Sequence, residues 1–249
     1  MSNNPPTTPH RPAGRSESHR AVYEGRGQAA LLAPDAVLKR AAEQLARQFA
    51  GMVSGETVER VVFESYAALA RTAKVSTLLP SLAEKFARDR LTALAQSRGL
   101  IPKRVPEILF VCVQNSGRSQ MAAALTRNYA GDRVHVRSAG SQPGEALLPS
   151  AVTALRERGI DVSEEFPKPL TDDVIRAADA VITMGCGDAC AVYPGRRYLD
   201  WHLADPADLS LDGVRELRDE IQLLVEDLVF DLAPTDVQRG LPDLATPTR

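Results

Sequence analysis

The sequence predicts an α/β protein: a four-stranded parallel sheet flanked by helices, preceded by a small all-α three-helix bundle. Two patterns lead to this prediction. Across residues 107–231, short apolar runs alternate with amphipathic segments, as in strands joined by helical crossovers. Across residues 34–99, apolar side chains recur only at helical spacing. We therefore expect two domains, separated by a linker at residues 100–106 that Pro102 and Pro106 frame.

Both ends of the chain have a composition that does not favour a packed core. Residues 1–33 are rich in Pro, Ser, Thr, Asn, Gly and Arg and predict a disordered segment, and residues 232–249 predict a flexible tail. The remainder of the 249 residues is long enough for one large or two small cores.

Charge and hydropathy exclude several classes of partner. A net charge of −2 argues neither for a nucleic-acid partner nor for an acidic membrane surface, and we expect neither. The first 27 residues contain no signal-like apolar segment, and no apolar run approaches the length of a membrane span. We therefore expect a cytoplasmic protein. Its three cysteines are too few for a disulfide framework and, in a reducing compartment, indicate redox or catalytic work.

Three amphipathic helices are expected in the first domain. The first begins at Pro34 and ends before Gly51, the second follows an N-cap at Ser54, and the third begins near Pro80 and stops at Gly99. The apolar positions that share a face are Val37, Leu38, Ala41, Leu45 and Phe49, then Val58, Val61, Val62, Tyr66, Leu69 and Ala73, then Leu82, Phe86, Leu91 and Leu94.

The sequence assigns no chemistry to these helices. A docking surface, a dimer contact, a lid and a module that only stabilises the chain all remain open. A helix-turn-helix DNA reader is disfavoured, because no stripe of basic residues marks a groove-facing helix.

The second domain is expected to alternate strands and helices. The predicted strands cover residues 108–113, 134–138, 180–184 and 198–201, and the predicted helices cover residues 119–129, 149–158, 171–177 and 211–230. A tight turn is predicted at Ala139-Gly140. Parallel sheets bind ligands at the carboxyl ends of their strands, so the loop after the first strand is the expected site.

That loop begins at Cys112 and carries an arginine after five intervening residues, at Arg118. Its backbone N–H groups can point at a common centre beside the positive end of the next helix, which suits a tetrahedral oxyanion. The same groups favour a thiolate at Cys112, the predicted nucleophile. Arg118 can offer a planar fork of donors to two anion oxygens. The predicted oxyanion-binding residues are Val113, Gln114, Asn115, Ser116, Gly117, Arg118 and Ser119.

Three loop residues have expected supporting roles. Ser119 can donate a hydrogen bond to the thiolate, Asn115 can hold a left-handed turn, and Gly117 can relieve crowding. The structural alternative is a buried core Cys112 beside a surface Arg118, because Cys and Arg often meet at this spacing by chance.

Three stretches carry a resemblance to a known family. Residues 111–122 resemble the active-site loop of the low-molecular-weight protein tyrosine phosphatase superfamily, and Gln120-Met121-Ala122 resembles its arsenate reductase branch. Residues 181–190 and 200–206 also resemble that branch, in the same order. The resemblance covers residues 106–230, and the N-terminal helices resemble a three-helix domain found in some actinobacterial members. It implies a low-molecular-weight phosphatase-like fold and an arsenate or phosphate-like oxyanion as substrate.

The resemblance also implies roles for residues outside the loop. Asp205, stiffened by Pro206, matches the family's general acid, with Asp200 as the runner-up and His202 as a surface residue. Cys186 would attack the Cys112–arsenic adduct, and Cys190 would then take over the disulfide as Cys186–Cys190.

Two activities follow from these residues. The first prediction is arsenate reduction by the three-thiol relay. The expected electron source is either thioredoxin or a low-molecular-weight thiol with a mycoredoxin-type protein. No bound cofactor is expected. A phosphatase is the alternative, since it needs only Cys112, Arg118 and Asp205. Ala207 counts against it, because phosphatases of the family usually place an aromatic residue there.

The chain departs from relatives at several other positions. Gly117 and Gln114 stand where many relatives have a cysteine and a glycine, and the gap from Cys186 to Cys190 is shorter than in the best-studied members. Ala123 stands where an acidic residue helps bind potassium in some relatives, so no metal is expected. A zinc site from the three cysteines and His202 is the metal alternative, but C-x3-C is not a usual zinc spacing.

Overall fold

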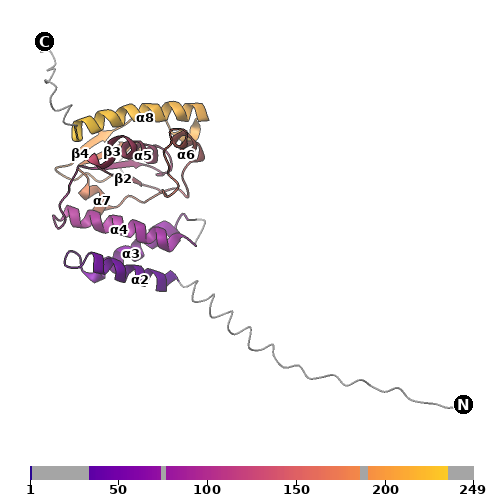
Figure 1. The fold of residues 1–249 in the computed structure, drawn as a ribbon, viewed down its shortest axis with the longest axis vertical. Coiled ribbons are helices and arrows are strands. Elements are labelled where there is room, and N and C mark those ends of the chain that lie inside the picture. Colours follow the sequence, from indigo (N-terminus) through magenta and orange to yellow (C-terminus); the bar gives the residue numbers. More distant parts are fainter. Residues whose placement is uncertain (2–33, 74–76, 186–189, 235–249) are drawn as a thin grey trace, which may run out of the picture. The chain divides into compact units, whose positions relative to one another are not determined.

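The computed structural model describes residues 1, 34–73, 77–185 and 190–234 (Figure 1). The chain divides into two compact units, Met1–Val37 and Leu38–Arg249. Of the first unit, only Met1 and the first turn of α2 lie in the described ranges. The predictions for residues 2–33 and 235–249 fall outside these ranges and stay predictions, as does the assignment of residues 100–106 as a domain linker.

Three helices precede the sheet, as expected: α2 (Pro34–Gln48), α3 (Gly55–Ala70) and α4 (Leu79–Ser97). The Ser54 side chain caps α3 by accepting a hydrogen bond from the Thr57 N–H at 3.3 Å. Their apolar faces meet in one cluster that includes Leu45, Val62 and Phe86. One predicted core residue is wrong: Ala73 is exposed, because α3 ends at Ala70 before its face returns to the cluster.

The sheet has the four parallel strands that the sequence predicts, in the order β2-β1-β3-β4. The strands are β1 (Glu107–Cys112), β2 (His135–Gly140), β3 (Ala180–Met184) and β4 (Arg197–Asp200). Every residue of β1 is buried, as the continuous apolar run suggested.

The tight turn predicted at Ala139-Gly140 is wrong, because both residues belong to β2 and pair with Val111 and Cys112. Gly140 is required for a different reason. A Cβ atom there would lie 2.7 Å from the Val113 carbonyl oxygen and 2.9 Å from the Asn115 backbone nitrogen. The glycine therefore lets β2 approach the loop that follows β1.

Helices cover both faces of the sheet. One face packs against α5 (Arg118–Ala130), α6 (Pro149–Arg156) and α8 (Leu211–Leu232) through a cluster that includes Ile108, Phe110 and Ile182. The other face, with Leu109, Val111 and Val181, packs against α7 (Asp172–Ala177) and against Ala93 of α4. A helix of the N-terminal segment therefore contributes directly to the core of the sheet, and Figure 1 shows α4 between α3 and α7.

Buried ion pairs join α3 and α4 to the sheet half. Arg90 on α4 is 8% exposed and contacts Asp173 at 3.0 Å, Glu64 at 3.2 Å and the Ser65 hydroxyl at 3.2 Å. Arg137 on β2 contacts Asp89 of α4 at 2.7 Å.

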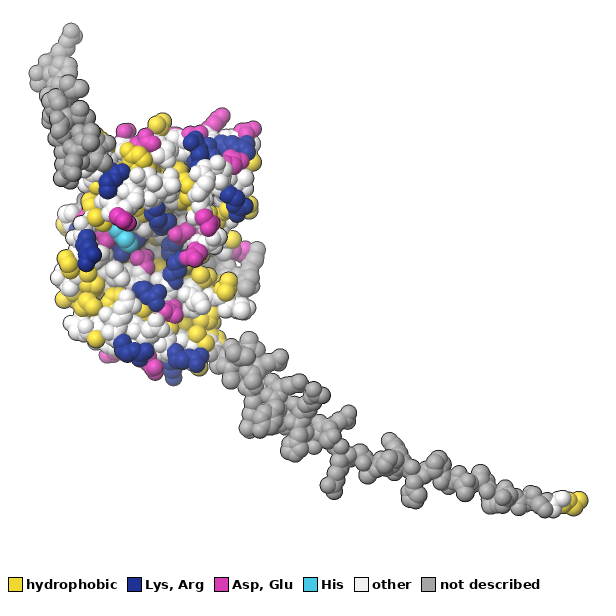
Figure 2. Space-filling model, in the orientation of Figure 1, with side chains coloured by type: hydrophobic (Ala, Val, Ile, Leu, Met, Phe, Trp, Pro, Cys, Tyr) yellow, Lys and Arg dark blue, Asp and Glu magenta, His cyan; other side chains and the backbone are white. Residues whose placement is uncertain are grey.

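On the face shown in Figure 2, Lys and Arg side chains are interspersed with Asp and Glu. None of the helices in the described ranges is both long and apolar enough to cross a membrane.

Candidate active site

Cys112 is the last residue of β1 and is 2% exposed. Its Sγ accepts a hydrogen bond from the Asn115 backbone N–H at 3.1 Å and lies 2.9 Å from the Ser119 hydroxyl. The Ser119 oxygen accepts in turn from the Asn115 side-chain amide at 2.8 Å, so its own proton is available for the sulfur. Two hydrogen-bond donors therefore converge on the sulfur of Cys112.

Asn115 holds the turn of the loop, as the sequence predicted. It is fully buried, and with φ of +50° it is the only non-glycine residue in the described ranges with a positive φ. Its side-chain oxygen accepts hydrogen bonds from the Lys168 backbone N–H at 2.8 Å and from the Gln120 amide at 3.1 Å. The left-handed turn is thus fixed from three sides.

The carbonyl groups of the loop point away from Cys112 into neighbouring backbone. Hydrogen bonds of 2.8–3.1 Å join the carbonyls of Cys112, Val113, Gln114 and Ser116 to the N–H groups of Ser141, Gln142, Gly144 and Leu148, respectively. In a planar trans peptide the N–H points opposite to the carbonyl. The N–H groups of the next residues therefore point away from those contacts, and the Asn115 N–H reaches the Cys112 sulfur, an arrangement compatible with the predicted anion cradle.

Arg118, the predicted anion-binding arginine, and Asp205, the predicted general acid, contact each other across this cradle. Arg118, at the start of α5, donates from Nη2 to Asp205 at 2.7 Å and from Nη1 to the Leu203 carbonyl at 3.5 Å. Pro206 closes over Gly117, where a Cβ atom would lie 2.5 Å from the proline Cγ. The glycine therefore relieves a specific contact, one with the loop that carries Asp205.

Together these residues enclose a small cavity of about 20 Å³. Its lining includes Cys112, Gln114, Ser116, Gly117, Arg118, Asp205 and Pro206. The runner-up acid, Asp200, does not line it. Asp200 instead accepts a hydrogen bond from the Thr183 hydroxyl at 2.6 Å, and it lies 3.5 Å from the exposed His202.

The two other cysteines are placed less completely. Cys186 lies outside the described residues. Met184, two residues earlier, pairs with Cys112 in the sheet, and Gly185 has φ of +74° and lies against Arg118, where a Cβ atom would be 3.1 Å from Nη1. Gly185, the last described residue before Cys186, therefore lies beside Arg118. Cys190 is half-buried, packs against the core cluster that includes Val111 and Val181, and does not line the cavity.

The sequence did not predict the residues that donate hydrogen bonds to the side-chain oxygen of Asn115. The Gln120 amide bridges Asn115 and the Phe166 carbonyl, at 3.1 and 3.0 Å, and is 1% exposed. The available signal was a polar residue inside the apolar face of α5. The hydrogen bond from the Lys168 backbone N–H to Asn115 could not be predicted from a local sequence pattern, because the two residues are 53 positions apart.

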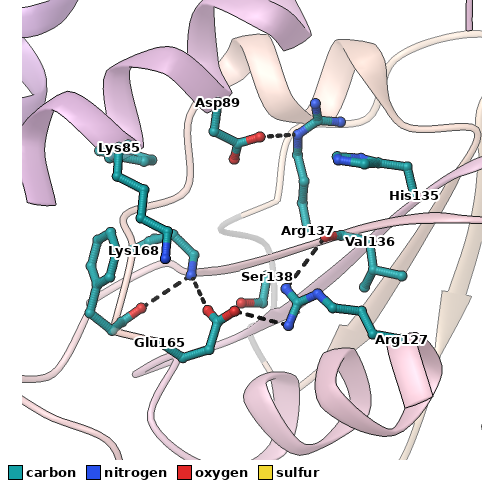
Figure 3. Close-up of a pocket in the computed structure, with 11 residues that line it drawn as sticks. Lys85, Asp89, Arg127, His135, Val136, Arg137, Ser138, Glu165 and Lys168 are labelled. Atoms are coloured by element: carbon teal, nitrogen blue, oxygen red, sulfur yellow. Dashed lines mark hydrogen bonds and ion pairs between the residues drawn. The ribbon is translucent and has the colours of Figure 1, made fainter. Parts of the chain in front are cut away.

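Residues 165–168 also border a larger hollow of about 270 Å³ beside α4 and β2 (Figure 3). Its charged groups are paired: Glu165 contacts Lys168 at 2.8 Å and Arg127 at 3.0 Å, and Arg137 contacts Asp89. Burial lowers the pKa of Lys168, with Glu165 opposing it. Burial raises the pKa of Glu165, but the charges of Lys168 and Arg127 outweigh burial and leave that pKa below its ordinary value.

No metal ligands gather in the part of the chain that the structure describes: no three His, Cys, Asp or Glu side chains are grouped as a metal site would require. The zinc alternative includes Cys186 and so falls partly outside those ranges.

Comparisons with known proteins agree with this geometry. Residues 107–239 match the family of low molecular weight phosphotyrosine protein phosphatases, and residues 38–95 match the N-terminal domain of protein-tyrosine-phosphatase-like proteins. The arsenate reductase of Bacillus licheniformis is 40% identical over 126 residues, which cover 46% of this chain and 88% of that protein. Arsenate reductase 1 of Staphylococcus epidermidis is 36% identical over 123 residues, 48% of this chain and 92% of that protein.

A solved structure extends the similarity to the N-terminal helices. The thioredoxin-dependent arsenate reductase of Corynebacterium glutamicum is 52% identical, with a TM-score of 0.71, over 79% of this chain and 96% of that one. The predicted fold is thereby confirmed. The chain belongs to the low molecular weight phosphotyrosine protein phosphatase family.

Proposed function

We propose that this protein reduces arsenate to arsenite, with Cys112 as the nucleophile and Cys186 and Cys190 as the thiols that complete the reduction. The observation that carries the proposal is the sheet register. Met184 pairs with Cys112, and Gly185, which precedes Cys186 in the sequence, lies against Arg118. The arsenate reductases among the relatives support the same activity.

In the first step, the Cys112 thiolate attacks the arsenic of arsenate and a sulfur–arsenic bond forms. Arg118 and the loop N–H groups hold the remaining oxygens as negative charge accumulates on them. The arsenic–oxygen bond opposite the sulfur breaks, and Asp205 protonates the leaving hydroxide to water.

This step requires the cradle to open. Arg118 is engaged with Asp205, and a cavity of about 20 Å³ has room for little more than one water molecule. Arsenate therefore displaces the Asp205 carboxylate from Arg118 and takes over its donors, while the Asp205 loop moves outward. Once released from Arg118, the carboxylate takes up from solvent the proton that it later gives to the leaving hydroxide. Asp205 is half-exposed, which makes this movement inexpensive.

In the second step, the Cys186 thiolate attacks Sγ of Cys112. The sulfur–arsenic bond breaks with its electron pair passing to arsenic, which leaves as arsenite, and a Cys112–Cys186 disulfide remains. The Cys190 thiolate then attacks Cys186, which releases the Cys112 thiolate and leaves a Cys186–Cys190 disulfide. A dithiol protein of the thioredoxin type reduces this disulfide, and the dependence on thiols places the reaction in a reducing compartment such as the cytoplasm.

The alternative is hydrolysis of a phosphate monoester, which Cys112, Arg118 and Asp205 would suffice to perform. Ala207 lines the cavity where family phosphatases usually have an aromatic residue, so this chain lacks that contact for a phosphotyrosine ring.

Two serine variants separate the activities. In Cys186→Ser, arsenate turnover with a thioredoxin system should be abolished, while slow hydrolysis of an aryl phosphate persists. In the matched Cys190→Ser variant, a single turnover should release one arsenite per protein before activity stops. Equal loss of arsenate reduction and phosphate hydrolysis in Cys186→Ser would show that Cys186 is structural and would overturn the relay.

A further inference from the structure

A second hollow in the described part of the chain has a basic lining that no acidic side chain offsets. Its volume is about 390 Å³, and its walls come from the end of α4, from α7 and from the turn before β4. Three arginines face it, Arg98, Arg176 and Arg196, together with Tyr193, and none of its lining residues is Asp or Glu. It shares no residue with the cavity at Cys112.

None of the three arginines forms an ion pair with another residue in the described ranges. Arg196 donates from Nη2 to the Arg176 carbonyl at 2.5 Å, and its Nε is buried without a hydrogen-bond partner. The Arg176 guanidinium lies 4.2 Å from the centre of the Tyr193 ring, which orients it. A buried donor without an acceptor is costly, so the position of Arg196 is maintained at the expense of an unsatisfied Nε.

The hollow beside α4 and β2 provides the contrast. It is also rich in Lys and Arg, but Lys168 and Arg127 are paired with Glu165, and Arg137 is paired with Asp89 (Figure 3). An excess of unpaired cations is therefore a property of the hollow at Arg176 in particular.

We propose that this hollow binds a small molecule through a phosphate group, with Arg98, Arg176 and Arg196 contacting the phosphate oxygens. Guanidinium forks match pairs of phosphate oxygens, and three positive charges suit a multiply charged anion better than a single carboxylate. A volume of about 390 Å³ exceeds the needs of inorganic phosphate and lies within the usual range for small-molecule sites. Tyr193 supplies a surface for the group that carries the phosphate.

Calorimetric titration of the full chain tests this site. Arg118→Ala serves as the background, because it removes the fork that would bind phosphate at Cys112. In that background, pyrophosphate should still bind saturably, and adding Arg98→Ala should weaken binding about tenfold, the usual effect of losing one charged hydrogen bond. Arg98 is exposed and its side chain makes no hydrogen bond in the described ranges, so this variant should fold normally.

Arg60→Ala is the matched control, because Arg60 is exposed on α3, away from the hollow, and pairs with Glu64. It should leave the affinity unchanged. Adenosine monophosphate and inorganic phosphate form the other arms: tighter binding of the nucleotide identifies a phosphate ester as occupant, and equal binding identifies free phosphate. Loss of all binding in Arg118→Ala, no effect of Arg98→Ala, or an equal effect of Arg60→Ala would each overturn the proposal.

Discussion

Replacing Asn115 by Ala should lower the free energy of unfolding by about 3–7 kcal/mol. The Lys168 N–H would remain buried without an acceptor, at a cost of about 1–3 kcal/mol. Loss of the hydrogen bonds to Ser119 and Gln120 would cost only about 0.5–1.5 kcal/mol of stability each, because each of these partners keeps another hydrogen bond. Alanine at φ of +50° adds roughly 1 kcal/mol of backbone strain.

Urea unfolding followed by circular dichroism measures this change, and two further variants identify its origin. Asn115→Gly lacks the same hydrogen bonds but tolerates the positive φ, so its loss should be roughly 1 kcal/mol smaller than that of alanine. Asn128→Ala removes an exposed asparagine of α5 and should change stability by less than about 0.5 kcal/mol. The reasoning fails if Asn115→Ala is within about 1 kcal/mol of the wild type, or if glycine is as disruptive as alanine.

Three other changes test the site and its support. Gly117→Ala should lower the kcat for arsenate while leaving stability nearly unchanged, because the new Cβ displaces Pro206 and with it Asp205. Steady-state assays and thermal unfolding measure these two effects, and an unchanged kcat would contradict the prediction. Asp205→Asn should slow single-turnover arsenite release about 10²–10⁴-fold, the usual contribution of a general acid, and a wild-type rate would exclude that role. The folded-state pKa of Glu165 is below its unfolded value of 4.5, so its carboxylate stabilises the protein above 4.5 and this contribution disappears as the pH falls through the folded-state pKa. Glu165→Gln should therefore lower Tm at neutral pH and flatten the acid side of the Tm profile, and a profile parallel to the wild type would refute the assignment.

Local patterns in the sequence were sufficient to predict the catalytic loop. A strand, a small-residue loop and a helix are contiguous between Glu107 and Ala130, so the meeting of Cys112, Asn115, Arg118 and Ser119 follows from one stretch of chain. The place of Asp205 in the site, 87 residues from Arg118, was predicted only through the family resemblance, and its ion pair with Arg118 was not predicted.

The rest of the site depends on contacts that the sequence does not encode locally. Gly140 was interpreted as a turn residue, because a glycine after an alternating strand usually marks one, whereas its role is to leave space for Asn115. The same limit applies to Lys168, whose backbone is brought to Asn115 by the folding of the whole domain.

Helical periodicity likewise shows that a face is apolar without showing what covers it. The pattern on α4 predicted a bundle complete in itself, and Phe86 does pack within that bundle. Ala93, two turns later, instead packs against the sheet.

The position of α4 bears on how this protein can be divided. A fragment beginning at residue 106 would lack α4 and so partly uncover the side of the sheet that carries Leu109 and Val111. It would also lose two counter-ions, Asp89 beside Arg137 and Arg90 beside Asp173. Exposed apolar strands of this kind promote aggregation. Expression or domain-exchange studies therefore need to carry the N-terminal helices along with the catalytic half.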